Sequence, residues 1–440
     1  MTAESPEGVN PHYLNHVVEA SASNEVVAGE DIVTSQGIKL LAKGARIDAG
    51  ARDRLLQHKL LKPLEDCVQV LGGDVAARIE PAGVALLDKH ALLRGLCAPD
   101  RARSAPASLA ALSLSLPVQS LLTVHARCLD ERLGHTMGVA MIALALARRL
   151  RPGDIDNHRV LATAGLLHDV GELYIDPAYL RKDTRLAAEE WRHIASHPVV
   201  AHRVLHGMAG AGPAVADAVL LHHERLDGFG YPRGVSAEAF ALNGQILAAA
   251  EWLMAVVEAD ASPLTRARMA AQLIPGEFDP ALLDALSDMA REAPDSPIEL
   301  ASALPLEMAA PRVMKLAETL SRFAETRSWI DERIATAQPG LRAVLLSGLQ
   351  RALRIQASFS STGLDVHSPE RLIGELAGLN DPAVYREITT LVGELEWRMR
   401  QLEREQRLRA SLLTPPEQGV ITELINRLKG RHTDRVEEAA

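Results

Sequence analysis

Apolar residues recur at helical spacing through most of this chain, and the helical signal is strongest between residues 118 and 295. Within that region, the long apolar runs VLATAGLLHDVGELYI and ILAAAEWLMAVV predict buried helices. The pattern stays helical over residues 296–440, where recurring prolines separate one helix from the next. We therefore expect a mainly α protein with a helical domain over 118–295 and a C-terminal helical region, regulatory or dimerising, over 296–440.

The N-terminal part has a different pattern. Residues 1–24 are polar, so we expect a disordered tail, whereas residues 25–72 contain short apolar runs broken by glycines. Such breaks predict short strands and turns, followed by a helix near residues 51–58, in a small accessory α+β domain. Residues 73–117 contain Pro81, Pro99 and Pro106 and are interpreted as a helical linker.

The segment LVGELEWRMRQLEREQRLRASLL near the C-terminus predicts an arginine-rich amphipathic helix. Charge at helical spacing is usually a solvated face, so a packing or dimerisation helix is favoured over a partner-recognition element. A homodimer formed through this region is one expectation.

Composition narrows the class of protein. With 440 residues, the chain is long enough for about three domains. Aromatic residues make up only 3%, so leucine, alanine, valine and isoleucine must do most of the packing. The net charge of −10 argues against general affinity for nucleic acid polymers or anionic membranes. A small phosphorylated ligand is still compatible, because bound metal ions can supply positive charge.

Three features favour a cytoplasmic protein that makes no membrane contact. The cysteines Cys67, Cys97 and Cys128 are not closely paired, which suits a reducing compartment and offers no cysteine zinc site. The start MTAESPEGVN lacks the pattern of a signal peptide. The longest apolar stretch, near residues 139–147, is far below the ~18 residues of a membrane span.

Histidines and carboxylates are placed where a buried charge would be costly without a partner. Glu131 and His135 are spaced i, i+4, which puts both on one face of a helix, although a surface Glu–His contact explains that spacing more often. His168 and Asp169 end a buried apolar run, and Gly171 is expected to terminate that helix. A hydrogen-bonded core histidine beside a helix-end aspartate is the alternative for that pair.

Further candidates follow along the chain. His197 precedes a proline, His222 and His223 end another apolar run, and Glu251 is the first charge in a strongly apolar helix. Together these are eight candidate ligands, which exceed the needs of one ion. Imidazoles and carboxylates without thiolates suit iron, manganese, cobalt, nickel or zinc.

The order of these motifs resembles the HD-GYP family of cyclic di-GMP phosphodiesterases. The matching pieces are Glu131…His135, HDVG from His168, HP from His197, and HHERLDGFGYP from His222. The resemblance runs from about residue 118 to about residue 295. It implies an all-helical HD domain in which His168 and Asp169 are catalytic. It also implies two or three divalent metals, iron or manganese first and zinc, cobalt or nickel as alternatives, held by Glu131, His135, His168, Asp169, His197, His222, His223 and Glu251.

The resemblance also implies roles around the substrate. A loop would shape the pocket and could contact signalling proteins; it comprises Asp227, Gly228, Gly230, Tyr231 and Pro232. Arg225, Arg233 and Lys182 are candidate contacts to a cyclic dinucleotide. Attack by a metal-activated water, held partly by Asp169, would release pGpG, or GMP after a second cut.

Three departures from the family pattern concern substrate binding and metal spacing. Glu172 stands where the family has a phosphate-binding lysine, and Glu251 replaces the metal-binding aspartate. The family's Arg-Pro-Tyr-Arg stretch is replaced by DASP at residues 260–263. Losing two contacts worth ~1.5–3 kcal/mol each would weaken substrate binding about a hundredfold or more unless other cations, such as Arg266 or Arg268, replace them.

Three functions are therefore weighed. The first is hydrolysis of cyclic di-GMP in bacterial second-messenger signalling. The second is a catalytically impaired module that binds nucleotide or partner proteins, which the missing cations favour. The third is an HD phosphohydrolase acting on another phosphate ester, for which a less cationic pocket would suffice.

Overall fold

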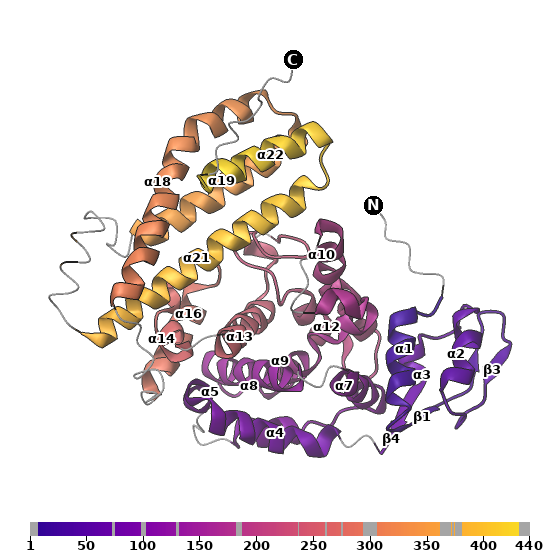
Figure 1. The fold of residues 1–440 in the computed structure, drawn as a ribbon. Coiled ribbons are helices and arrows are strands. Elements are labelled where there is room, and N and C mark those ends of the chain that lie inside the picture. Colours follow the sequence, from indigo (N-terminus) through magenta and orange to yellow (C-terminus); the bar gives the residue numbers. More distant parts are fainter. Residues whose placement is uncertain are drawn as a thin grey trace. The chain divides into compact units, whose positions relative to one another are not determined.

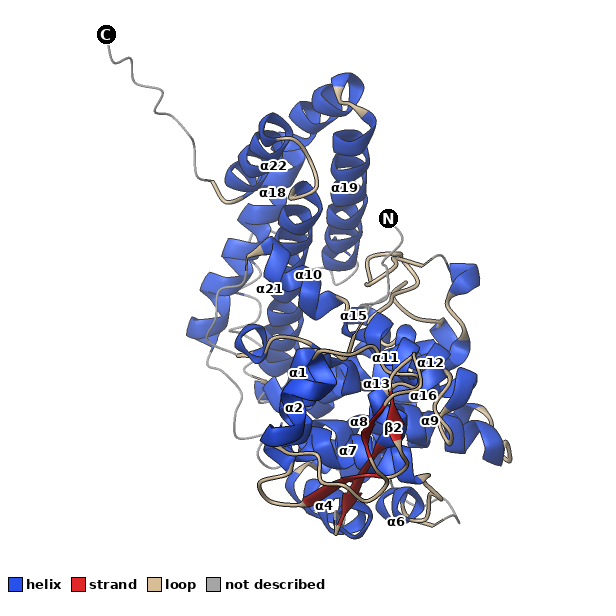
Figure 2. Ribbon diagram, turned by 90° about the vertical axis from the view of Figure 1, so that its right-hand side faces the viewer, coloured by secondary structure: helices blue, strands red, loops and turns tan. Residues whose placement is uncertain are grey.

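The computed structural model describes residues 8–72, 75–97, 103–128, 132–181, 187–235, 237–259, 262–273, 276–293, 306–360, 371, 374 and 381–430. The chain forms two compact units. The first comprises residues 1–185, 193–260 and 276–294, and the second comprises 186–192, 261–275 and 295–440. The predicted mainly α fold with a small strand-containing region is confirmed, since all the strands described lie before residue 72 (Figure 2).

The first described helix contradicts the expected disordered tail. Helix α1 (Pro11–Ala20) begins after Asn10, whose side chain accepts hydrogen bonds from the backbone N–H groups of His12 and Tyr13. Tyr13, Leu14 and Val17 form a buried apolar stripe at helical spacing, which the polar average of the segment concealed. The prediction was therefore wrong for residues 8–24, and residues 1–7 lie outside the described part.

The glycine-broken region forms two small antiparallel sheets with short helices. Strand β1 pairs with β4 and β2 pairs with β3. Asp48 caps α2 by accepting from the N–H groups of Gly50 and Ala51. The elements are β1 (Glu25–Ala28), β2 (Ile32–Val33), β3 (Lys39–Leu41), α2 (Ala49–Leu56), α3 (Leu64–Cys67) and β4 (Val68–Leu71).

This N-terminal region packs on the segment that carries the candidate site. The ring of Tyr13 stacks on Tyr174 with centroids 4.9 Å apart, and the Tyr174 hydroxyl donates a 2.5 Å hydrogen bond to Glu65 of α3. Tyr174 ends the 3-10 helix η1 (Val170–Tyr174), which follows directly after His168 and Asp169. Residues 8–72 are thus part of the first unit.

Residues expected to form a linker are also part of the packed core. They form α4 (Val75–Lys89), α5 (Ala91–Leu96) and α6 (Ala105–Ala110), all of which contact α8 (Arg132–Leu150). Leu92 and Leu93 are buried, and Gly83 leaves room for Pro106 and Met141. These segments therefore supply apolar surface to the core, as a linker would not.

The remaining helices of the first unit surround α8 and α9 (Ile155–Leu167), which pack closely together (Figure 1). The apolar middle of α8, residues 139–147, is buried along its whole length, so this helix forms the centre of the unit. The other elements are α7 (Leu116–Cys128), η2 (Pro177–Leu180), α11 (His197–His206), α12 (Gly212–Leu220), η3 (Ala237–Ala239), α13 (Leu242–Ala259) and α16 (Pro280–Glu292). Helix α10 (Ala188–Ala195) is divided between the two units after Arg192.

Two glycines let three helices approach closely near the candidate ligands. A Cβ on Gly165 of α9 would lie 2.4 Å from the Cα of Ala140 in α8, and one on Gly138 would lie 2.1 Å from the sulfur of Met254 in α13. Gly165 precedes His168 by one helical turn, and Gly138 follows His135 by the same interval. Glycine at these two positions therefore sets the spacing of the helices that carry ligands.

Gly165→Ala is expected to destabilise the first unit by about 3 kcal/mol, because the added methyl meets backbone rather than a flexible side chain. The measurement is the free energy of unfolding by denaturant. Gly134→Ala in α8 is the matched control, since its nearest contact would be an ordinary 3.9 Å from Leu86. It should gain about 0.5–1 kcal/mol. A Gly165→Ala protein as stable as wild type would contradict the packing described.

The second unit is helical in its described part. Its long helices are α18 (Leu306–Thr336), α19 (Pro339–Ser360), α21 (Pro382–Ala410) and α22 (Pro415–Leu428), and its short ones are α14 (Pro263–Arg268) and α15 (Ala270–Leu273). The arginine-rich segment lies in α21 and packs on α18, α19 and α22 through Leu391, Leu395 and Leu402, as the packing interpretation required. Among the described helices, none is long and apolar enough to cross a membrane.

Candidate metal centre

Seven of the eight predicted ligands converge in the first unit. They form two groups, within each of which one ligand atom per residue lies within 4.8 Å of the others. Glu131 lies outside the described residues. The first group is Asp169, His197, His222 and His223, and the second is His135, His168 and Glu251.

Asp169 faces both groups with one carboxylate. Its Oδ1 lies 3.4 Å from Nε2 of His197 and 3.7 Å from Nε2 of His222. Its Oδ2 lies 3.2 Å from Nε2 of His168 and 4.0 Å from Nε2 of His135. Each oxygen therefore points to a different ligand group, which is the arrangement of a carboxylate that bridges two ions.

Three histidines are oriented by carbonyl groups three residues before them. Nδ1 of His168 donates to the Gly165 carbonyl at 2.8 Å, Nδ1 of His197 donates to Ile194 at 2.8 Å, and Nδ1 of His222 donates to Val219 at 2.5 Å. A carbonyl only accepts, so each Nδ1 carries a proton and each Nε2 is the nitrogen that would bind a metal. These carbonyls are free to accept because the histidines stand at or just beyond helix ends.

His135 is held between two carboxylates of α13. Its Nε2 lies 2.9 Å from Oε2 of Glu251, and its Nδ1 lies 3.2 Å from Oε2 of Glu258. Sequence reasoning missed Glu258, although its i, i+7 spacing from Glu251 places both on the same face of one helix. Glu258 thus orients the imidazole, as carboxylates behind metal-binding histidines do.

Charge is distributed unevenly between the groups. Burial lowers the pKa of His168, but Asp169 and Glu251 outweigh burial and raise the pKa to about 10. Burial, reinforced by His222, lowers the pKa of His197 to about 4. Burial raises the pKa of Asp169, but His168, His222 and His197 hold it well below its usual range. In the metal-free protein, the group around His168 therefore binds protons that a cation would displace.

The donor set fits divalent transition metals. Five imidazoles and two carboxylates without thiolate match the preferences of iron, manganese, cobalt, nickel and zinc. Nε2 of His168 is fully buried, and among the described residues it makes no hydrogen bond, although it lies 3.2–3.3 Å from carboxylate oxygens of Asp169 and Glu251. A cation would satisfy this atom and both carboxylates at once.

The loop after His223 is anchored by a buried carboxylate. Glu224 accepts from the backbone N–H groups of Arg233 at 2.7 Å and Val235 at 3.1 Å. The ring of Tyr231 then stacks on His223 with centroids 4.5 Å apart. Glu224 was not among the predicted site residues, although it directly follows the paired histidines. It sets the loop against the metal ligands.

Gly228 and Gly230 serve this loop in different ways. Gly228 adopts φ +76°, a left-handed conformation that glycine tolerates best. Gly230 has no such angle, but a Cβ there would lie 2.3 Å from the Cα of Glu224. Tyr231 and Pro232, which follow, are joined by a cis peptide bond.

Other predicted substrate contacts have structural partners. The Arg225 guanidinium donates to the Glu224 carbonyl at 2.7 Å, lies 3.5 Å from Glu277 and covers the ring of Phe278. Asp227 accepts from the Phe229 N–H at 3.1 Å, which forms a turn. Arg233 is exposed, and Lys182 lies outside the described residues. Arg225 and Asp227 therefore hold the loop.

Two further predictions concern the segment after Asp169. Gly171 was expected to end the helix, but α9 ends at Leu167 with His168 as its C-cap. Gly171 instead allows close approach, since a Cβ there would lie 2.1 Å from the His197 carbonyl oxygen. Glu172 is buried, and Arg266 lies in the second unit, where it pairs with Glu394.

Comparison with known proteins identifies the same part of the chain. The family model described as HD domain matches residues 113–276. A 3'3'-cGAMP-specific phosphodiesterase of Vibrio cholerae is 29% identical over 205 residues, 44% of each chain. A cyclic di-GMP phosphodiesterase of Pseudomonas aeruginosa is 36% identical over 108 residues, 24% of this chain and 26% of the relative. A cyclic di-GMP phosphodiesterase response regulator of Xanthomonas campestris is 32% identical over 130 residues, 29% of this chain and 32% of the relative.

These matches span less than half the length of each relative. The range of the family model, residues 113–276, contains the seven ligands that converge. The motif order, the two ligand groups and the family model agree on one domain. Together they show that the chain carries an HD domain of the HD-GYP type.

Proposed function

We propose that this chain is a metal-dependent phosphodiesterase that hydrolyses cyclic di-GMP or a related cyclic dinucleotide. The observation that carries the proposal is the Asp169 carboxylate, which turns one oxygen toward each ligand group. The names of the relatives from Vibrio, Pseudomonas and Xanthomonas support this class of substrate. The product would be the linear dinucleotide pGpG, or GMP after a second cut.

When bound, divalent ions would supply a nucleophile from water at neutral pH and neutralise charge on the phosphate oxygens. The residues of the chain do the positioning. The carbonyl-bound Nδ1 atoms fix the rings of His168, His197 and His222 before substrate arrives. Asp169 and Glu251 bring the negative charge that balances the cations. The loop held by Glu224 places Tyr231 beside the centre.

Iron or manganese is the proposed metal, with two ions in the described groups and a third if Glu131 adds a ligand. Zinc, cobalt and nickel are the alternatives, since the donor types suit all five metals. Contacts of the loop with signalling proteins and formation of a homodimer stay predictions.

A second candidate function is a metal-stabilised module that binds nucleotide without turnover. Two residues favour this function, because neither offers a free positive charge to a phosphate group of the substrate. Glu172 is a carboxylate where the family pattern has lysine. The Arg225 guanidinium already pairs with Glu277 and covers the ring of Phe278. A site with fewer free cations binds a dinucleotide more weakly. The same features would suit hydrolysis of another phosphate ester.

One experiment separates the three functions. Protein prepared with manganese or with iron is analysed for metal content and then incubated with cyclic di-GMP or 3'3'-cGAMP, and products are followed by chromatography. Turnover that is lost in His168→Ala/Asp169→Ala and kept in His202→Ala supports the first function, because His202 lies on α11 outside both ligand groups. Binding without product supports the module. Release of phosphate only from a generic ester supports the third, and protein that cannot be loaded with metal excludes all three.

Glu172→Lys is expected to raise affinity for cyclic di-GMP by about tenfold or more, because a charge-assisted phosphate contact contributes ~1.5–3 kcal/mol. Affinity is measured by calorimetry on metal-loaded protein. Glu172→Gln is the control that removes the negative charge without adding a positive one, and it should give a smaller gain. Unchanged affinity in a folded Glu172→Lys protein would mean that residue 172 does not face the phosphate.

A further inference from the structure

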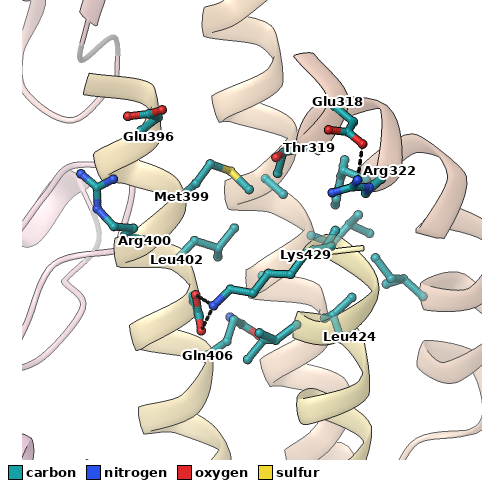
Figure 3. Close-up of a pocket in the computed structure, with 18 of the residues that line it drawn as sticks. Glu318, Thr319, Arg322, Glu396, Met399, Arg400, Leu402, Gln406, Leu424 and Lys429 are labelled. Carbon is teal, nitrogen blue, oxygen red and sulfur yellow. Dashed lines mark hydrogen bonds and ion pairs between the residues drawn. The ribbon is translucent and has the colours of Figure 1, made fainter. Parts of the chain in front are cut away.

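The second unit contains a cavity of about 530 Å³ among helices α18, α19, α21 and α22 (Figure 3). This volume falls within the ~300–1,000 Å³ of small-molecule sites in proteins. The cavity lies outside the residues that match the HD domain, so the phosphodiesterase proposal gives it no role. Its apolar lining includes Phe323, Ile330, Leu349, Leu402, Leu424 and Ile425.

Gln406 of α21 lines this cavity with a buried amide that lacks a partner. The residue is only 3% exposed, and within the described part of the chain neither its Oε1 nor its Nε2 makes a hydrogen bond. A buried amide without a partner is destabilising, so leucine or methionine would serve a purely structural bundle better. The amide therefore marks a position where a hydrogen-bonding group from outside the chain would fit.

The helix facing Gln406 makes room for the amide group itself. Gly348 lies in the interior of α19, where glycine costs about 1 kcal/mol relative to alanine. A Cβ at Gly348 would lie 2.7 Å from Oε1 of Gln406. The glycine thus lets the amide of Gln406 lie directly against α19, and any side chain at position 348 would displace it.

The charges around the cavity nearly cancel. Its lining holds four cationic side chains and three carboxylates. Lys429 extends across the cavity to Glu403 at 2.7 Å, and Arg322 pairs with Glu318 (Figure 3). With the charges so balanced and two of the cations already paired, the cavity has little to select a strongly anionic ligand such as a nucleotide.

We propose that this cavity binds a neutral, mainly apolar small molecule whose adjacent donor and acceptor atoms pair with the Gln406 amide. A lactam or a heterocyclic amide fused to an apolar ring has this chemistry. The primary amide of glutamine offers N–H donors beside a carbonyl acceptor, so one such edge satisfies both of its ends. The apolar side chains of the four helices would cover the remainder of the ligand.

The test compares two probes of similar shape on the full-length protein. 2-Quinolinone is a bicyclic lactam, and naphthalene has the same two rings without the amide. Calorimetry should show wild type binding 2-quinolinone at least about tenfold more tightly than naphthalene, because the lactam satisfies the buried amide. In Gln406→Met, which conserves volume, this preference should disappear. Gln350→Met, an exposed position on α19, is the matched control and should keep the preference.

A second readout does not depend on either probe. Without ligand, Gln406→Met should melt at a higher temperature than wild type, because it removes an unpaired buried amide. A lower melting temperature would show that the amide is already satisfied and would overturn the proposal. The proposal also fails if wild type binds neither probe, or if Gln406→Met still prefers 2-quinolinone. None of these outcomes depends on whether the HD domain hydrolyses a dinucleotide.

Discussion

Asp169→Asn is expected to abolish phosphodiester hydrolysis, with a loss of about a thousandfold or more, and to remove at least one metal ion per chain. Among the described ligands, Asp169 turns one oxygen to each group. Asparagine keeps the shape but replaces one oxygen by an NH₂ donor, which repels a cation. Whichever way the amide turns, one ligand group loses its carboxylate oxygen, so that group would bind a cation more weakly.

Metal content by elemental analysis and turnover of cyclic di-GMP are measured on the same preparations. Asp176→Asn is the matched control, because Asp176 lies seven residues further on and only caps η2 through the Ala178 N–H. It should keep its metal and change turnover by no more than about twofold, since asparagine caps a helix about as well as aspartate does. An Asp169→Asn protein with the metal content of wild type would refute the bridging role.

Gly230→Ala is expected to lower turnover about a hundredfold while leaving most of the metal in place. The new methyl would lie 2.3 Å from Cα of Glu224 and 2.5 Å from the Arg225 nitrogen. The Glu224 backbone cannot yield easily, because its carboxylate holds the N–H groups of Arg233 and Val235. The loop must therefore move as a whole, which shifts Tyr231 off His223, and displacements near 1 Å at a reacting centre cost about 10²-fold.

Kinetic constants and metal content are compared with those of Gly207→Ala. Gly207 follows α11 with φ −97°, and no atom lies within 4 Å of the position that its Cβ would take. That control should stay within about 0.5 kcal/mol of wild-type stability and keep full turnover. If Gly230→Ala turned over substrate at the wild-type rate, the loop would have no part in the reaction.

The candidate ligands that the structure brings together could be predicted from the sequence because they conflict with their surroundings. His168, Asp169 and Glu251 interrupt long apolar runs, where an unpaired charge is costly. Their order along the chain also matched a known family. The helices α8, α9 and α13 could be predicted for a related reason, since their apolar runs are too long for strands.

Prediction from sequence failed in two situations. In one, the average polarity of a segment conceals an apolar helix face; in the other, a residue contacts a segment far away in the sequence. Residues 8–24 are polar on average, yet Tyr13, Leu14 and Val17 of α1 make one apolar face. Gly171 carried the signal of a helix end, but its role is contact with the carbonyl of His197, 26 residues away. The average composition conceals the spacing of the first, and the second leaves no trace in the local sequence.

By itself, the sequence identified the candidate metal ligands, since donor chemistry and helical spacing are local properties of the chain. Only the tertiary structure decided how they are used. It turned the two oxygens of Asp169 to different groups, placed Glu258 behind His135 and committed Arg225 to Glu277 and Phe278. It also left the Gln406 amide unpaired beside a cavity. These outcomes depend on packing between helices, which fixes distances and orientations that no single segment encodes.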